Sequence, residues 1–284
     1  MVQFRAIPVF SLVVGTLVGD FGKAVAICWP WLAIVMATIG TILVMQPELA
    51  PVFTRAGAAD AQMSSTAWLA LGVNYALWFV AGSSMAVNWH RFLLRNDSPD
   101  GWEHLRLDGK VWRYAGSTLL ISFIAVLVLV VFFIVIISVA ILMRGGQSVV
   151  PNNPLALGLA FLLLIPVSLA VGPLLIIVML RLSIKLPAIA VGDDYGLVDA
   201  WRDSRGYNIG LFGFALLLVL PTLFLAIGHL LVDYTLGLLM GAESLLKTVV
   251  TALAWVAMTW VNMMFAITGL AMLYAVFANG AEID

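Results

Sequence analysis

Two stretches of the sequence gather basic and aromatic side chains that could bind the phosphate of an anionic lipid headgroup. The first begins Trp89-His90-Arg91, directly after an apolar run, and the second lies between residues 181 and 206. Guanidinium groups hold phosphate oxygens through paired hydrogen bonds, and tryptophan prefers the headgroup zone of a bilayer. The residues predicted to bind anionic lipid are Trp89, His90, Arg91, Arg95, Arg181, Lys185, Arg202 and Arg205.

If this site exists, we expect Arg91 to lie beside Arg181 and Lys185, with Trp89 closing the apolar side where acyl chains begin. Converging basic groups between membrane spans can bind anionic headgroups. The same charges can also fix the orientation of the chain in a membrane without binding anything. Both interpretations stay open at the level of sequence.

Two asparagines, a histidine and an aspartate fall within apolar runs. Asn74 and Asn262 lie near the middles of their runs, where an amide is expected to bond to another helix. His229 and Asp233 are four residues apart and share a helix face, which suits either a proton relay or the outer end of a span.

The sequence contains no Gly-x-Ser-x-Gly, His-Glu-x-x-His or Walker-type motif, so we predict no catalytic residue. Asp193 and Asp194 have no histidine cluster beside them, and we predict neither a metal nor a cofactor. The single cysteine, Cys28, is expected to be a small buried hydrophobe. Prolines 166 and 173 are expected to kink one span, and Pro221 interrupts another; broken helices also occur in transporters.

The composition requires a membrane as solvent for the chain. Of its 284 residues, 63% are hydrophobic and only 10% are charged, and the mean hydropathy is +1.09. A soluble domain is nearer to ~25% charged, and it could not hide this much apolar surface. The net charge of −1 gives no electrostatic case for binding nucleic acid.

The predicted fold class is all-α, because only helices satisfy the backbone polar groups of such runs within lipid. A span needs about 20 apolar residues. We predict a single membrane domain over residues 1–284, with six transmembrane helices at about 24–45, 66–88, 114–143, 154–181, 208–232 and 248–277.

Lysine and arginine are distributed unevenly between the two sides of this arrangement. If both termini lie on one side, the opposite side holds only Arg55, Arg144 and Lys247 of the 14 basic residues. The positive-inside rule then places both termini in the cytoplasm, in an inner (plasma) membrane. Short interfacial helices are expected on that side, within residues 8–22, 89–113 and 183–206.

The last of these segments is the most structured. We predict a short helix through residues 197–201, which Asp193 or Asp194 caps at its N-terminus and Gly206 follows at its C-terminus. Pro187 is expected to close the element before it.

Residues 181–210, RLSIKLPAIAVGDDYGLVDAWRDSRGYNIG, resemble a signature of the multi-pass family related to the membrane domain of glycerophosphoryl diester phosphodiesterase. Residues 86–97, AVNWHRFLLRND, resemble the basic segment after the second span in bacterial relatives. The resemblance implies a six-span plan over the whole chain. In the fused enzymes a soluble phosphodiesterase domain follows, and here the resemblance implies a chain without it.

Together these features predict a non-enzymatic integral membrane protein. It would be an accessory or structural component, or a subunit of a larger membrane protein complex, that binds anionic lipid at its cytoplasmic face. A transporter or flippase for a lipid or small solute is the first alternative, and a membrane enzyme of unrecognised type is the second. The expected partners are membrane lipids and other membrane proteins, with no nucleic acid.

Overall fold

The computed structural model describes residues 4–46, 49, 63–143, 171–241 and 244–280. Every regular secondary-structure element in these ranges is a helix, as the apolar runs predict. The elements are α1 (Ala6–Gly19), α2 (Phe21–Met45), α4 (Ser65–Arg95), the 3₁₀ helix η2 (Gly101–Leu105), α5 (Gly109–Met143), a helical segment over residues 171–183, α7 (Lys185–Val191), α8 (Leu197–Asp203), α9 (Asn208–Met240) and α10 (Leu245–Asn279).

Six of the helices within the described ranges are long and apolar enough to cross a membrane. Each overlaps one of the six predicted spans, but several continue further than predicted, and the fourth reaches Val191 rather than ending near residue 181. The helix α4 runs to Arg95 rather than ending near residue 88, and α9 runs to Met240 rather than ending near residue 232. Residues 154–170 of the predicted fourth span, with Pro166 and most of the expected kink, lie outside the described residues.

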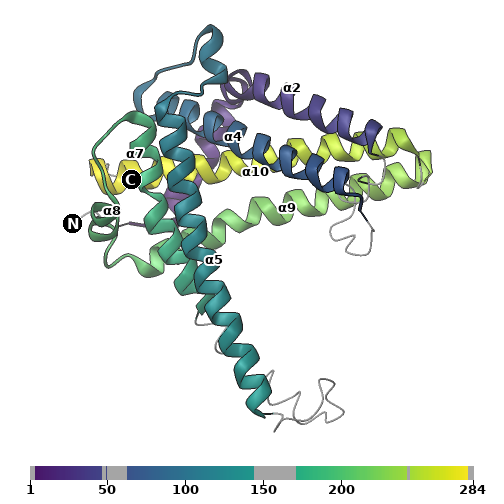
Figure 1. Ribbon diagram of the computed structural model, residues 1–284. Helices are drawn as coiled ribbons and strands as arrows, with labels where there is room; N and C mark the ends of the chain where they lie inside the picture. Colours follow the sequence, from purple (N-terminus) through teal and green to yellow (C-terminus); the bar gives the residue numbers. More distant parts are fainter. Residues whose placement is uncertain (1–3, 47–48, 50–62, 144–170, 242–243, 281–284) are drawn as a thin grey trace.

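The helices α5, α9 and α10 are longer than a bilayer requires. They contain 35, 33 and 35 residues, which is about 50 Å each at ~1.5 Å per residue. The hydrocarbon layer is only ~30 Å thick, so such helices must tilt or extend into the headgroup zones. Figure 1 shows α5 diverging from the α9–α10 hairpin along its length.

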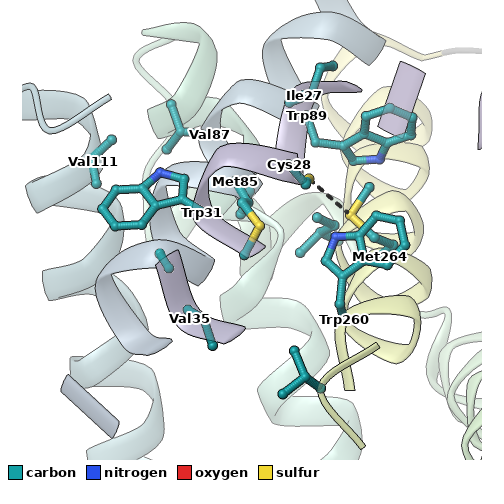
Figure 2. Close-up of a cluster of buried hydrophobic side chains, with 14 of the residues drawn as sticks. Ile27, Cys28, Trp31, Val35, Met85, Val87, Trp89, Val111, Trp260 and Met264 are labelled. Carbon is teal, nitrogen blue, oxygen red and sulfur yellow. Dashed lines mark hydrogen bonds between the residues drawn. The ribbon is translucent and has the colours of Figure 1, made fainter. Parts of the chain in front are cut away.

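The helix α4 occupies the centre of the fold, and α2, α5, α7 and α10 all pack against it. The residues from Ser83 to His90 are buried, on every face of the helix. Figure 2 shows the apolar part of this centre, where Cys28 of α2 approaches Met264 of α10 with 4.0 Å between the sulfur atoms. Cys28 is therefore buried among hydrophobic side chains, as expected.

Both ends of the described chain lie at one end of the molecule, beside α8, which we call the basal end (Figure 1). The ring of Phe4 lies 5.3 Å from that of Phe277 and 6.3 Å from that of Tyr207. Between these contacts and α2, the helix α1 packs across α9 and α10 through Val9 and Val13. A chain with an even number of spans has both of its ends on the same side, as observed here.

The segment between residues 184 and 206 corrects two predictions. Pro187 does not close an element; it lies in the first turn of α7, where a helix has no need of its missing N–H. The N-cap of α8 is Gly196, whose N–H donates to the carboxylate of Asp199 at 3.0 Å, and neither Asp193 nor Asp194 caps it.

Candidate anion-binding site

Trp89 and His90, two of the residues predicted to bind a headgroup, lie inside the fold rather than at its surface. Both side chains are fully buried in the centre of the fold. The Nε1 of Trp89 donates to the hydroxyl of Thr268 at 2.8 Å, and the Nε2 of His90 lies 3.3 Å from the hydroxyl of Tyr114. The helix α4 continues through this stretch, and α5, α7 and α10 pack around it. The polar atoms of Trp89 and His90 therefore face protein rather than lipid.

Arg91 and Arg95 remain near the surface, but each already has a carboxylate partner. Arg91 binds Asp97 through both Nε, at 2.9 Å, and Nη2. The Nη2 of Arg95 donates to Asp193 at 2.8 Å, and the other oxygen of that carboxylate accepts from the hydroxyl of Tyr274 at 2.6 Å. These bonds attach the loop after α7 to both α4 and α10.

Lys110, at the start of α5, is a further basic residue near these arginines that was not among the predicted site residues. Its ammonium group interacts electrostatically with the positive charges of Arg91, Arg95 and Arg106. The group also lies so close to Gly192 that a Cβ there would be 3.4 Å from Nζ. Only the three-dimensional arrangement brings the start of α5 against the end of α7, so no local sequence pattern indicates this cluster.

Arg181 differs from these arginines because its charge has no counter-charge. It is only 5% exposed, and no carboxylate of the described chain lies within ion-pair distance of it. Its Nη2 donates to the carbonyl of Ser204 at 3.0 Å and to the amide oxygen of Asn208 at 2.7 Å. The ring of Trp201 lies 4.8 Å from the guanidinium carbon, and Nε has no hydrogen-bond partner among the described residues.

Arg205 adds a second positive charge beside Arg181. It too lacks a carboxylate at ion-pair distance in the part of the chain that the structure describes. Arg202, three residues earlier, is the opposite case: its side chain is 67% exposed and pairs with Asp199 at 2.9 Å and with Asp203 at 3.1 Å. The hydrogen bond and negative charge of Asp203 raise the pKa of Arg202.

The N-terminus of α9 adds further positive potential at the same place. This helix begins at Asn208, the residue that Arg181 binds, and the side chain of its N-cap, Tyr207, makes no capping bond. The first N–H groups of a helix carry partial positive charge and attract anions. Two guanidinium groups and a helix N-terminus therefore converge at the turn between α8 and α9.

The predicted eight-residue site thus divides into separate parts. Arg91 and Arg95 are neutralised at the end of α4, whereas Arg181 and Arg205 meet without an acid at the α8–α9 turn. The predicted contact of Arg91 with Arg181 is absent from the contacts of the described residues. Lys185 is half-buried as the first residue of α7.

Burial also acts on a phenol close to this turn. Tyr195 lies between Asp193 and α8, and its ring packs edge-on against that of Tyr274 at 5.5 Å. Burial, assisted by the negative charges of Asp203 and Asp199, raises the pKa of Tyr195. The phenol therefore stays neutral at physiological pH and adds no charge beside the two arginines.

The amides predicted to bridge helices have different surroundings. Asn262 of α10 accepts a hydrogen bond from the hydroxyl of Thr222 of α9 at 2.6 Å, so its side chain links two helices. Asn74 is buried in α4, and its amide oxygen has no partner among the described residues.

His229 and Asp233 lie inside α9, which continues past them to Met240. Asp233 pairs with Lys247 of α10 at 3.1 Å and accepts from the hydroxyl of Thr251 at 3.4 Å. The Nδ1 of His229, one turn earlier, is buried without a described partner. The bonds of Asp233 therefore join α9 to α10 far from the basal end, close to the turn at Gly241.

Within the described ranges, no group of three histidine, cysteine, aspartate or glutamate side chains could hold a metal ion. The similarity to the phosphodiesterase membrane domain stays a prediction, carried by the residues quoted above. No protein-family model, curated protein or solved structure matches the chain.

Proposed function

We propose that this protein is a non-enzymatic component of an inner membrane that binds anionic phospholipid at its basal end, with that end and both termini in the cytoplasm. The excess of basic residues on the side of the termini supports this orientation, because positively charged loops are retained in the cytoplasm. The bound lipid would attach the protein, or a larger complex that contains it, to anionic regions of the membrane.

The uncompensated charge of Arg181 is the observation that carries the proposal. A buried ion without a counter-ion is costly, because the protein replaces only part of its hydration. The two neutral acceptors on Arg181 supply hydrogen bonds but no negative charge. A phosphate group would supply both, and hydrogen bonds between ionised partners are roughly twice as strong as neutral ones. The second guanidinium, Arg205, would bind the same phosphate.

Apolar side chains around the α8–α9 turn favour a lipid headgroup over a soluble anion. Val198 is 78% exposed, Ile209 is 89% exposed and Trp201 is 42% exposed. Large apolar side chains beside basic ones are typical of a surface at the membrane interface, where acyl chains meet headgroups. A soluble phosphate would use the two arginines and leave these apolar groups in water.

Lipid retention in variants of matched charge tests this proposal. We expect Arg181→Gln to lose phosphatidylglycerol in native mass spectrometry, while Arg202→Gln retains it, because Arg202 already has two carboxylate partners. Arg181→Lys keeps the charge and should retain lipid partially, since an ammonium cannot make the bidentate contact. This second variant separates a lost binding group from a failure to fold.

Inorganic phosphate distinguishes the two possible sources of the anion. For a lipid site, millimolar phosphate should displace little phosphatidylglycerol, and nanodiscs of phosphatidylcholine alone should yield no retained lipid. If phosphate empties the site, the ligand is a soluble anion. Equal retention by the Arg181→Gln and Arg202→Gln proteins would show that the basic residues set topology only.

A further inference from the structure

We propose that α8 is a lid over Arg181, and that an anionic headgroup opens it by replacing the Ser204 carbonyl on the guanidinium. This inference rests on the proposed function and states how the site is regulated. In the closed state, the protein itself occupies the group that the lipid needs.

Two of the three contacts of Arg181 come from the segment between Gly196 and Gly206, which carries α8, and the third comes from Asn208 at the start of α9. The ring of Trp201, the carbonyl of Ser204 and the amide of Asn208 make its cation–π contact and both of its hydrogen bonds. With only 5% of Arg181 exposed, a phosphate gains full access to the guanidinium only when this segment moves. Binding and movement are therefore one event.

The segment is weakly attached to the rest of the fold. Within α8 only Ala200 is fully buried, and Val198 is 78% exposed. Lifting the helix therefore uncovers mainly the methyl group of Ala200 and the part of the Trp201 ring that lies on Arg181. Glycine stands at both ends of the segment, as the N-cap Gly196 and as Gly206, whose φ of +95° is a conformation open to glycine. These two positions absorb a rotation of α8 at little steric cost.

The residues before Gly196 form the fixed side of the hinge. Asp193 binds Arg95 and Tyr274, and the ring of Tyr195 packs edge-on against that of Tyr274. A motion of α8 therefore stops at this anchor instead of spreading to α7. At the other side, α9 is a continuous helix from Asn208, so Arg205 stays near the hinge and within reach of the bound phosphate.

The exchange of partners explains why an anion would open the lid. Closed, the guanidinium has two neutral acceptors and an aromatic face. Open, it has a phosphate, whose charge-assisted bonds are the stronger ones. A ligand shifts a conformational equilibrium only by its preference for one state, and here the phosphate binds only the open state.

Thiol labelling of Ala200 measures the lid directly. In a Cys28→Ala background, the variant Ala200→Cys places a thiol that the closed lid buries, and Ala188→Cys places a control thiol in the buried part of α7. In phosphatidylglycerol nanodiscs we expect maleimide to label position 200 faster than in phosphatidylcholine, on the order of tenfold, a usual coupling between two sites. Labelling at position 188 should be equally slow in both lipids.

A second measurement removes the closing contact without lipid. Adding Arg181→Gln to the Ala200→Cys protein should make labelling fast in both nanodiscs, and adding Arg202→Gln should change nothing. Slow, equal labelling in both lipids by a protein that still retains phosphatidylglycerol would overturn the lid and leave the proposed function intact. If the parent protein retained phosphatidylglycerol and phosphatidylcholine equally, both the lid and the proposed function would be overturned.

Discussion

At the scale of single residues, Gly210 shows how closely the N-terminal segment packs on α9. A Cβ at this position would lie 2.6 Å from Cδ1 of Phe4, whose ring is already held by its aromatic neighbours. We expect Gly210→Ala to lower the free energy of unfolding by about 1–3 kcal/mol, as overpacking does. Gly213→Ala is the control, because its Cβ would meet Ala6 at an ordinary 3.5 Å. Thermal unfolding in one detergent compares them, and equal midpoints would contradict the packing argument.

The hydrogen bond between Thr222 and Asn262 makes a second prediction at this scale. Thr222→Val keeps the shape of the side chain but leaves the amide oxygen of Asn262 without its donor. We expect a loss of about 0.6–2 kcal/mol, the range for such bonds between membrane helices. Thr235→Val removes only a bond to the carbonyl of Leu231 in the same helix and should cost less. A larger loss from Thr235→Val in the same unfolding assay would reverse this ranking.

At the scale of elements, Asp193 attaches the loop before α8 through its two partners on α4 and α10. Asp193→Asn weakens the bond to Arg95 by removing its charge, so the loop should open more often. We expect trypsin to cleave after Arg202 and Arg205 faster in this variant than in the parent. Asp194→Asn, at an exposed neighbour, should be cleaved at the parental rate. Unchanged cleavage of the Asp193→Asn protein would mean that another contact holds the loop.

The elements also show which part of the structure could be predicted from sequence. Hydropathy predicted six apolar helices, because lipid imposes length and composition on a helix locally, although the fourth extends ten residues past its predicted end. The predicted end of the second span, near residue 88, was wrong because His90 and Arg91 are typical of a loop. Only helices distant in the sequence make the burial of this stretch favourable. The predicted N-cap of α8 was wrong for a similar reason. Asp193 has partners on α4 and α10, and no local sequence pattern indicates them.

The candidate site followed the same division. Sequence selected Arg181 and Arg205 by type and by their place beside a span. It also selected Arg91 and Arg95, which the fold neutralises with Asp97 and Asp193. Distinguishing these pairs requires the position of each carboxylate, and this depends on how loops from three parts of the chain meet.

At the scale of the whole molecule, the proposed orientation predicts which thiols are accessible from outside the cell. In a Cys28→Ala background, Leu239→Cys near the end of α9 should react with a membrane-impermeant maleimide on intact cells, and Asp100→Cys near η2 should not. Both positions are exposed, so disrupting the membrane should make both react. Labelling of position 100 in intact cells would reverse the orientation.

The burial of α4 has a consequence for the order in which the protein is made. Its best window has a mean hydropathy of only 1.3, the lowest of the six spans. Its polar half depends on residues synthesised much later: Trp89 binds Thr268, 179 positions further along the chain, and Arg95 binds Asp193, 98 positions further along. When α4 leaves the ribosome, these partners do not yet exist. The second span therefore completes its polar contacts only after the last helix has been made.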